Sequence, residues 1–429
     1  MFQSRKTLVL AIASALTPLV FAPSALASGF ALSNPNAPGI GNAFAGAAAT
    51  AEDASTIFTN PAGMTLLPEG HNITATATLL NRSLKFNDTG TTINPGQFLG
   101  SNGGNAGGHS VIPAGYWAMS ISPDLRIGVG VSPTFGNKSE YTPDFIGRFA
   151  GYYTELKQIN INPSIAYKVN DTFSVGLGAN YAKNEIEFRQ KVGSPFGPVN
   201  FKLEGDDTAW GWNVGALYQV TPMTRLGATY RSKIKFDLSG NQIVTLDATG
   251  NTLAPFTYAI RSTLETPDTF SLALSQRIDQ QWELLADLTW TGWSSVNTLP
   301  VIQSSTGTTA NSLSYNFKNT WRAGLGANYQ LNNAWKLRAG IAHDEAPVRA
   351  DSDRTMTLPD SNRTWLSLGT RYSLSKVTSL DVGYAHIFFK GSSTNRTVTS
   401  PTTQLPVQQV RGNFDASAEY LSVQVNHNF

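Results

Sequence analysis

Histidines, acidic clusters and glycine-rich turns are the features that could do chemistry in this sequence, and none forms a catalytic constellation. Five histidines are spread over the chain, and the only acid–base cluster, His343-Asp344-Glu345, has neither HExxH spacing nor an evident serine partner. Gly39-Ile40-Gly41 lacks the spacing of a dinucleotide loop, and no GxxxxGK[ST] phosphate loop occurs. The absence of cysteine excludes thiol catalysis and iron–sulfur clusters. We therefore expect no enzyme, no metal site and no cofactor.

The charge of the chain is low and balanced. Its 429 residues include 31 Lys and Arg against 29 Asp and Glu, and charged residues make up only 14%, where about 25% is usual for soluble proteins. No basic excess or basic run is present to hold phosphates, so we expect no nucleic-acid partner. The composition argues against an ordinary cytosolic protein.

The first 27 residues have the organisation of a secretory signal peptide. Arg5 and Lys6 precede an apolar stretch over 7–22, and Ala25-Leu26-Ala27 provides a small-x-small cleavage site. Prolines within and after the short apolar run disfavour the alternative, an N-terminal membrane anchor. The predicted mature chain is exported and begins at Ser28.

The exported part alternates with a period of two. In the last segment Leu421, Val423 and Val425 share one face, while Ser422 and Gln424 share the other. No window holds 18 uninterrupted apolar residues, which excludes a helical membrane protein. Alternation of this kind is typical of β-strands with two different faces. A soluble sandwich would bury the apolar face, whereas an outer-membrane barrel would turn it to lipid.

Three features favour the barrel. Aromatic residues such as Trp282 and Trp290 lie at strand ends, as interfacial girdles require; connections alternate between short and long; and the chain ends in Phe429 on an amphipathic strand. The sequence therefore predicts an all-β fold, a 14-stranded antiparallel transmembrane β-barrel in the outer membrane of a Gram-negative bacterium. The predicted strands are 71–87, 109–122, 125–139, 155–168, 172–191, 207–220, 224–239, 262–278, 282–295, 314–330, 335–346, 363–374, 378–390 and 413–429.

Two further expectations concern the barrel wall. Pro267 lies inside the eighth predicted strand, where it removes a ladder donor and predicts a bulge. Leu285, Leu366 and Leu368 are assigned to the inner face, which argues against an open general porin with a polar lumen. The barrel is predicted to occupy residues 70–429, and the short connections are predicted to face the periplasm.

Residues 28–69 have no clean strand alternation. Small residues are frequent, a short helix is expected around 40–50, and the acidic pair Glu52-Asp53 follows it. A 14-stranded barrel is wider than eight-stranded barrels filled by side chains and narrower than open porins. We therefore predict that 28–69 form a plug, or hatch, inside the lumen.

Several short stretches of the mature chain carry a family resemblance. They are Ser28-Gly29-Phe30, Gly39-Ile40-Gly41, Ala43-Phe44-Ala45-Gly46, Glu52-Asp53-Ala54-Ser55, Asn60-Pro61-Ala62-Gly63-Met64, Gly147-Arg148-Phe149, Asn162-Pro163-Ser164, Trp293-Ser294, Leu358-Pro359-Asp360 and Arg363-Thr364-Trp365-Leu366-Ser367. With these stretches the sequence resembles the FadL-type family of outer-membrane transporters for long-chain fatty acids and other hydrophobic compounds. The resemblance covers essentially the whole mature chain, and the Asn-Pro-Ala element after an acidic pair is its most specific part.

The resemblance implies passive, ligand-gated transport with lateral exit at a kinked third strand. In this chain that strand contains Pro133 and Gly136, which suit a break near 132–136; the alternative is an ordinary strand end at the rim. Ligand arrival would displace Ser28, Gly29 and Phe30. The hatch element Asn60, Pro61 and Ala62 would respond, with Asn60 bonding to backbone freed by the kink and Pro61 stiffening the turn.

The resemblance also implies a ligand site with a basic head-group contact. The residues we predict to bind ligand are Phe30, Arg189 and Lys191 on the fifth strand, and Arg148 in the loop before it. The alternative for these cations is contact with lipopolysaccharide or water. The surroundings of Arg189 depart from the family pattern, so a neutral monoaromatic hydrocarbon, which needs no cation, stays open as the ligand.

The remaining expectations concern partners and competing functions. We expect a monomer that contacts outer-membrane lipid and lipopolysaccharide, and an assembly signal for the barrel assembly machinery at Phe429. A general porin, an outer-membrane hydrolase and an adhesive barrel are the competing interpretations. An open porin would conduct ions freely, whereas a plugged transporter would not.

Overall fold

The computed structural model describes residues 29–429, except 33–35, 94–97, 195–196, 246, 249–250, 253–254 and 401–404. The predicted signal peptide and Ser28 lie outside the described residues. Within them, no helix is long and apolar enough to cross a membrane.

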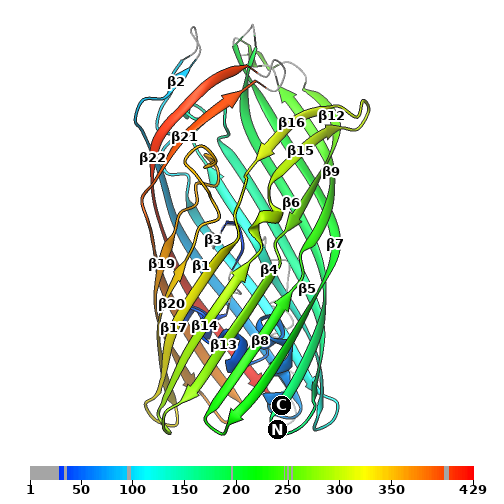
Figure 1. Ribbon diagram of the computed structural model, residues 1–429, viewed down its shortest axis with the longest axis vertical. Coiled ribbons are helices and arrows are strands. Elements are labelled where there is room, and N and C mark those ends of the chain that lie inside the picture. Colours follow the sequence, from blue (N-terminus) through cyan, green and yellow to red (C-terminus); the bar gives the residue numbers. More distant parts are fainter. Residues whose placement is uncertain are drawn as a thin grey trace.

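The described chain forms a closed 14-stranded antiparallel barrel (Figure 1). Two of the fourteen positions in the wall are each occupied by two consecutive strands. The barrel closes where β1 pairs with β22 along the whole length of β1. The wall strands are β1 (His71–Asp88), β3 (Gly108–Ser120), β4 (Leu125–Glu140), β5 (Tyr153–Lys168), β6 (Phe173–Ser194), β7 (Gly197–Thr221), β8 (Thr224–Arg231) with β9 (Ile234–Thr245), β12 (Phe256–Thr266) with β13 (Thr269–Arg277), β14 (Trp282–Thr291), β17 (Thr320–Gln330), β18 (Trp335–Asp344), β19 (Arg363–Ser373), β20 (Thr378–Phe389) and β22 (Pro406–Asn428).

The remaining strands belong to the connections. We name the end of the barrel with tight turns the short-turn end and the opposite end the long-loop end. Figure 1 places β2, β15, β16 and β21 toward the long-loop end, above most of the wall. These connecting strands are β2 (Thr92–Ile93), β10 (Asp247–Ala248), β11 (Asn251–Thr252), β15 (Thr298–Gln303), β16 (Thr309–Ser314) and β21 (Ser392–Thr399).

Most predicted strands are confirmed, and the differences lie toward the long-loop end. The sixth wall strand begins at Gly197, ten residues before the predicted start. The ninth ends at Thr291 and continues as a short 3-10 helix, η2 (Trp293–Ser295), and the tenth begins only at Thr320. At Pro267 the eighth wall strand is interrupted between β12 and β13, so a break in the strand stands where a bulge was predicted.

The outer surface carries apolar and aromatic side chains at the heights where lipid is expected. Pairs such as Trp282 with Tyr329 and Trp335 with Tyr372 pack in a tilted arrangement across neighbouring strands, with ring centroids 4.7 and 4.6 Å apart. Leu366 and Leu368 belong to this outer surface, being 54% and 61% exposed, so their assignment to the inner face was wrong. Leu285 is buried and does face inward.

The hatch fills the lower lumen with short helices joined by tight bends. Instead of one helix around 40–50 there are two, because Ala43, Phe44 and Gly46 between them adopt positive φ and break the run. Figure 1 shows this segment, in blue, inside the barrel near the short-turn end. Its helices are α2 (Ala37–Gly41), α3 (Ala47–Thr50), α4 (Thr56–Thr59) and the 3-10 helix η1 (Pro61–Leu66).

The wall itself makes room for the hatch backbone. A side chain at Gly340 would lie 2.1 Å from the carbonyl oxygen of Asn42, and one at Gly383 would lie 2.2 Å from that of Ala37. Only glycine permits an approach this close. The hatch backbone therefore packs directly against the backbone of strands β18 to β20. Replacing these glycines by any larger residue would push the hatch away from the wall.

The lumen changes character with height. On the inner face of β1, Thr76 and Thr78 are hydrogen-bonded to Gln424 and Ser422 of β22 around the hatch. Farther along the same face, Leu80 and Leu84 are fully buried. The lower lumen is thus polar and occupied, whereas the lumen above the hatch is lined by apolar side chains.

Candidate functional site

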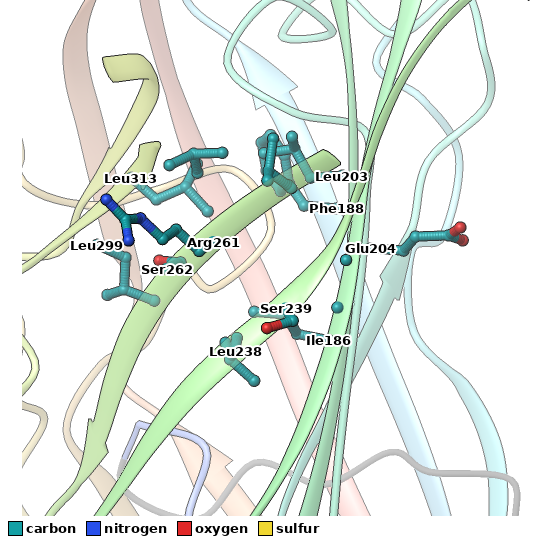
Figure 2. A pocket seen from close by; sticks show the side chains of 14 residues that line it. Ile186, Phe188, Leu203, Glu204, Leu238, Ser239, Arg261, Ser262, Leu299 and Leu313 are labelled. Carbon is teal, nitrogen blue, oxygen red and sulfur yellow. The ribbon is translucent and has the colours of Figure 1, made fainter. Parts of the chain in front are cut away.

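The first element of the site is a small cavity of about 40 Å³ in the upper wall, which we name the outer cavity. Its lining comes from β6, β7, β9, β12 and the β15–β16 hairpin, and Figure 2 shows Leu203, Phe188, Ile186 and Leu238 around it. The lining is mostly apolar with few polar groups, as is usual for ligand pockets. The lining residues are Ile186, Phe188, Leu203, Glu204, Gly205, Leu238, Ser239, Gly240, Ile260, Arg261, Ser262, Leu299, Val301 and Leu313.

A second cavity of about 20 Å³, the inner cavity, adjoins the first. Ile186 and Leu299 line both, so the two cavities share a wall. Nothing charged lines the inner cavity among the described residues. Its lining residues are Phe30, Asn137, Thr154, Leu156, Ile186, Leu264, Leu299, Tyr315 and Leu358.

The floor of the inner cavity is an aromatic cluster around Phe30. The Phe30 ring packs edge-on against Trp293 and Phe135, with centroids 4.9 and 5.8 Å apart. Gly29 precedes it at φ 61°, and a side chain there would lie 2.6 Å from the Trp293 ring. The start of the described chain is therefore shaped to fit under the cavity.

Residues 29–32, which we name the arm, are held by three hydrogen bonds, two with the backbone of β4 and one with the side chain of Asp360. The Gly29 N–H donates to Asp360 Oδ2 at 2.7 Å, Leu32 N–H donates to the Thr134 carbonyl at 2.9 Å, and Gly136 N–H donates to the Phe30 carbonyl at 2.9 Å. The last two bonds add the arm to the kinked strand β4. Burial raises the pKa of Asp360 to about 6, against the opposing effect of Arg363.

Strand β4 is irregular where the arm joins it, which confirms the predicted break. The register with β5 shifts between Pro133 and Phe135, so Thr134 is an extra, bulged residue. Strands β3 and β4 pair only from Gly115 opposite Val131 downward. Above that point β3 pairs with β1 and β4 with β5, leaving what we name the pairing gap between residues 108–114 and 132–140.

The opposite side of the hatch carries a buried ion network, which we name the anchor. Glu52 lies 2.8 Å from Arg338, 3.2 Å from Arg371 and 3.4 Å from Lys336. Burial alone would raise the pKa of Glu52, but these cations hold it well below its usual range. Asp53 and Asp381 complete the network. The anchor residues are Glu52, Asp53, Lys336, Arg338, Arg371 and Asp381.

The structure separates the residues predicted to bind ligand. Phe30 lines the inner cavity. Arg189 lies on the outer face of β6, next to inward-facing Phe188, and pairs with Glu187 at 2.5 Å over the Tyr153 ring. Lys191 lies on the same outer face and donates to Asn200. Arg148 donates to the carbonyls of Phe98, Leu99 and Phe145 and closes its loop. None of the three cations lines either cavity.

The predicted partner of Asn60 was wrong. Its amide donates to the carbonyls of Ala48, at 2.7 Å, and of Ala216 on β7, at 2.9 Å, instead of to the kinked strand. Its oxygen accepts the Ala62 N–H and caps η1, whose first residue is Pro61. Asn60 thus ties the hatch to the sixth wall strand, far along the wall from β4.

Sequence reasoning missed several site residues. Trp293 and Asp360 were noted only as parts of matching stretches, without a role. Arg261 was not singled out; it lines the outer cavity, is exposed, and makes no hydrogen bond or ion pair among the described residues (Figure 2). In the His343-Asp344-Glu345 cluster, Asp344 pairs with Arg363 at 3.1 Å, a structural ion pair at the end of β18.

Comparison with known proteins places the chain. A family model described as "Outer membrane protein transport protein (OMPP1/FadL/TodX)" matches residues 18–429. The long-chain fatty acid transport protein of Escherichia coli K12 is 30% identical over 90% of this chain and 93% of its own. A FadL homologue from Pseudomonas aeruginosa superposes with a TM-score of 0.85 at 24% identity, covering 94% of this chain and all of its own.

A third likeness is more distant. The toluene transporter TodX of Pseudomonas putida superposes with a TM-score of 0.68 at 18% identity, covering 88% of this chain and 94% of its own. The chain belongs to the OMPP1/FadL/TodX family of outer-membrane transport proteins.

Proposed function

We propose that the protein takes up long-chain fatty acids by passive diffusion, with capture in the outer cavity, transfer to the inner cavity and sideways release at the pairing gap. The observation that supports this route most strongly is its continuity. Two adjoining apolar cavities end on Phe30, and Phe30 belongs to the arm that fills the interrupted wall beside β4.

The apolar lining supplies most of the affinity in this proposal. Burying about 14 methylenes contributes roughly 11 kcal/mol gross, whereas a charge-assisted contact to the carboxylate adds about 1.5–3 kcal/mol. Arg261 is the cation we assign to that contact, because it lines the outer cavity and has no partner among the described residues. Arg189 and Lys191 face outward, a placement that favours contact with lipopolysaccharide.

Gating in this proposal is displacement of the arm. A chain entering the inner cavity competes with Phe30 for the space above Trp293, and Gly29 and Leu32 then leave Asp360 and Thr134. Withdrawal of the arm frees the edge of β4 at Pro133 to Gly136 and uncovers the pairing gap. Asn60, Pro61 and Ala62 stay with β7 and serve as the fixed part of the hatch.

A second candidate ligand class is the neutral aromatic hydrocarbon. The inner cavity has an aromatic floor and, among the described residues, no charged side chain in its lining. Such a ligand would use the same route without Arg261. Two relatives by fold are named as toluene transporters.

Equilibrium binding and uptake test the route and separate the ligand classes. Leu299, shared by both cavities, is changed to Asp, and palmitate and toluene are compared as ligands. We expect Leu299→Asp to abolish binding of both, and Arg261→Gln to weaken palmitate alone, by about tenfold. The matched control, Arg189→Ala on the outer face, should change neither. Palmitate uptake that is indifferent to Leu299→Asp would overturn the route.

A further inference from the structure

A buried arginine lies at the pairing gap without a counter-charge. Arg82 is on the inner face of β1 between Leu80 and Leu84, and only 2% of it is exposed. Its Nη1 donates to Asn137 Oδ1 at 3.1 Å and its Nη2 to Ser139 Oγ at 3.3 Å. Its Nε is buried with no hydrogen-bond partner, and no described carboxylate forms an ion pair with it.

Two other buried arginines of the barrel, Arg338 and Arg363, are neutralised by carboxylates. Arg338 pairs with Glu52 and Asp381, and Arg363 pairs with Asp344 and Asp360. Moving an unpaired charge out of water is costly, so buried charges are normally paired. Arg82 instead has only two neutral side-chain acceptors and no carboxylate, the arrangement expected of a site that an anion completes.

The position of Arg82 joins the inner cavity to the gap. Its two hydrogen bonds reach from β1 to β4, across the stretch where β3 and β4 do not pair. Asn137, which accepts one of them, also lines the inner cavity. A ligand that leaves this cavity toward the gap therefore meets Arg82 through Asn137.

We propose that Arg82 is a carboxylate-binding site at the pairing gap, occupied by the head group of an anionic amphipathic ligand as its chain leaves the inner cavity. This proposal rests on the route described under the proposed function. A carboxylate can accept two N–H bonds from the guanidinium, including the unpartnered Nε, while Asn137 and Ser139 are released. A neutral ligand gains nothing from this contact.

The test compares palmitate with hexadecanol, which has the same chain length and no charge, in proteoliposomes that contain the full mature chain. We expect Arg82→Gln to slow palmitate transfer about tenfold and to leave hexadecanol transfer unchanged, whereas Arg82→Lys should retain most of the palmitate rate. Arg126→Gln is the matched control, since Arg126 is another buried arginine of the wall that bonds only to nearby turn carbonyls.

A second variant protects the test against misfolding. Asn137→Asp places a carboxylate beside Arg82 and supplies its counter-charge from within, which compensates for loss of the hydrogen bond that Asn137 Nδ2 donates to the Thr357 carbonyl. We expect palmitate transfer to fall while hexadecanol transfer persists. An unchanged ratio of the two rates in both Arg82→Gln and Asn137→Asp, or an equal loss of both rates, would overturn the carboxylate site. If the unmodified protein transfers neither compound, the route itself is wrong and the site falls with it.

Discussion

On one side of the lumen the hatch meets the wall through buried ion pairs, and on the other through two backbone hydrogen bonds to β4 and one hydrogen bond from the Gly29 N–H to the Asp360 carboxylate. The anchor joins Glu52 and Asp53 to β18, β19 and β20, whereas the arm joins residues 29–32 to β4 and Asp360. Breaking a buried ion pair costs about 3–5 kcal/mol, and a backbone hydrogen bond contributes about 0.5–1.5 kcal/mol net. The difference indicates a hatch that stays in place while its first residues move.

The glycines of the wall agree with this division. Gly340 and Gly383 let the hatch backbone pack directly on the anchor side. On the arm side β4 is bulged, and β3 does not pair with its upper part. The backbone N–H and C=O groups at this edge of β4 can therefore bond to the arm or to another partner. Lateral opening therefore requires loss of few interactions, whereas expulsion of the hatch requires loss of many.

The largest expected effect comes from removing the central charge of the anchor. Glu52→Gln leaves Arg338, Arg371 and Lys336 with too little counter-charge, and we expect the hatch to be destabilised by about 3–5 kcal/mol. Ion conductance of the purified protein in a planar bilayer should rise sharply. Conductance equal to that of the unmodified protein would contradict the anchor's role.

A smaller effect is expected at the arm. Asp360→Asn removes the charge that accepts the Gly29 N–H, which should weaken arm docking by about 1.5–3 kcal/mol. A spin label on the cysteine introduced by Ala31→Cys, in this otherwise cysteine-free chain, should report greater mobility. Conductance should stay low, because the anchor is intact; a rise like that of Glu52→Gln would erase the distinction between the two sides. Asp351→Asn, in the same loop, is the control.

Gly29→Ala should loosen the arm by about 1–2 kcal/mol, since a non-glycine residue at φ 61° is strained and the new methyl group would lie against Trp293. The same spin label measures the effect. Ala47→Gly, a change of similar size in the hatch away from the arm, is the control and should leave the label immobile. A label equally immobile in Gly29→Ala would show that the arm is not fitted to Trp293.

The smallest expected effect is a pH dependence of the loop that holds Asp360. Its pKa is raised from 3.8 to about 6 by burial, so the buried state favours the protonated carboxyl. The resulting stability is present in full below about pH 4 and is lost as the pH rises through about 6. Amide hydrogen exchange in 345–362, corrected for intrinsic rates, should show easier opening at about pH 7 than at about pH 4.5, and Asp360→Asn should remove this difference. Protection that increases with pH would contradict the sign.

The strands and the hatch could be predicted from local signatures, whereas the break in β4 was expected from the family resemblance, with which Pro133 agrees. Alternation with a period of two marks the wall, Pro133 removes a ladder donor, and the small residues before Glu52 fit no strand. The anchor could not be predicted in this way, since Glu52 and Arg338 lie 286 residues apart and neither alternation nor spacing joins them.

The error at Arg189 has a physical cause in the same strand. Below Tyr181 the outer face of β6 carries Val175 and Leu177, as lipid requires, and above it the outer face carries charges such as Lys183 and Glu187. Meanwhile the inner face changes from Asn180 to Ile186 and Phe188. In the lower part of β6 the polar side chains face the lumen, and a cation would be expected to do the same. Above the membrane the apolar side chains face the lumen instead, so Arg189 faces outward.

The central claim is that the arm moves while the rest of the hatch stays in place. A reversible disulfide between the arm and β4 tests this claim most directly. Ala31 and Phe135 form a non-hydrogen-bonded antiparallel pair, the geometry in which side chains lie closest, and the chain has no other cysteine. Ala31→Cys with Phe135→Cys should abolish palmitate uptake when oxidised and restore it on reduction, while Thr78→Cys with Ser422→Cys, across two strands that stay paired, should have no effect. Full uptake with the arm disulfide formed would contradict the account.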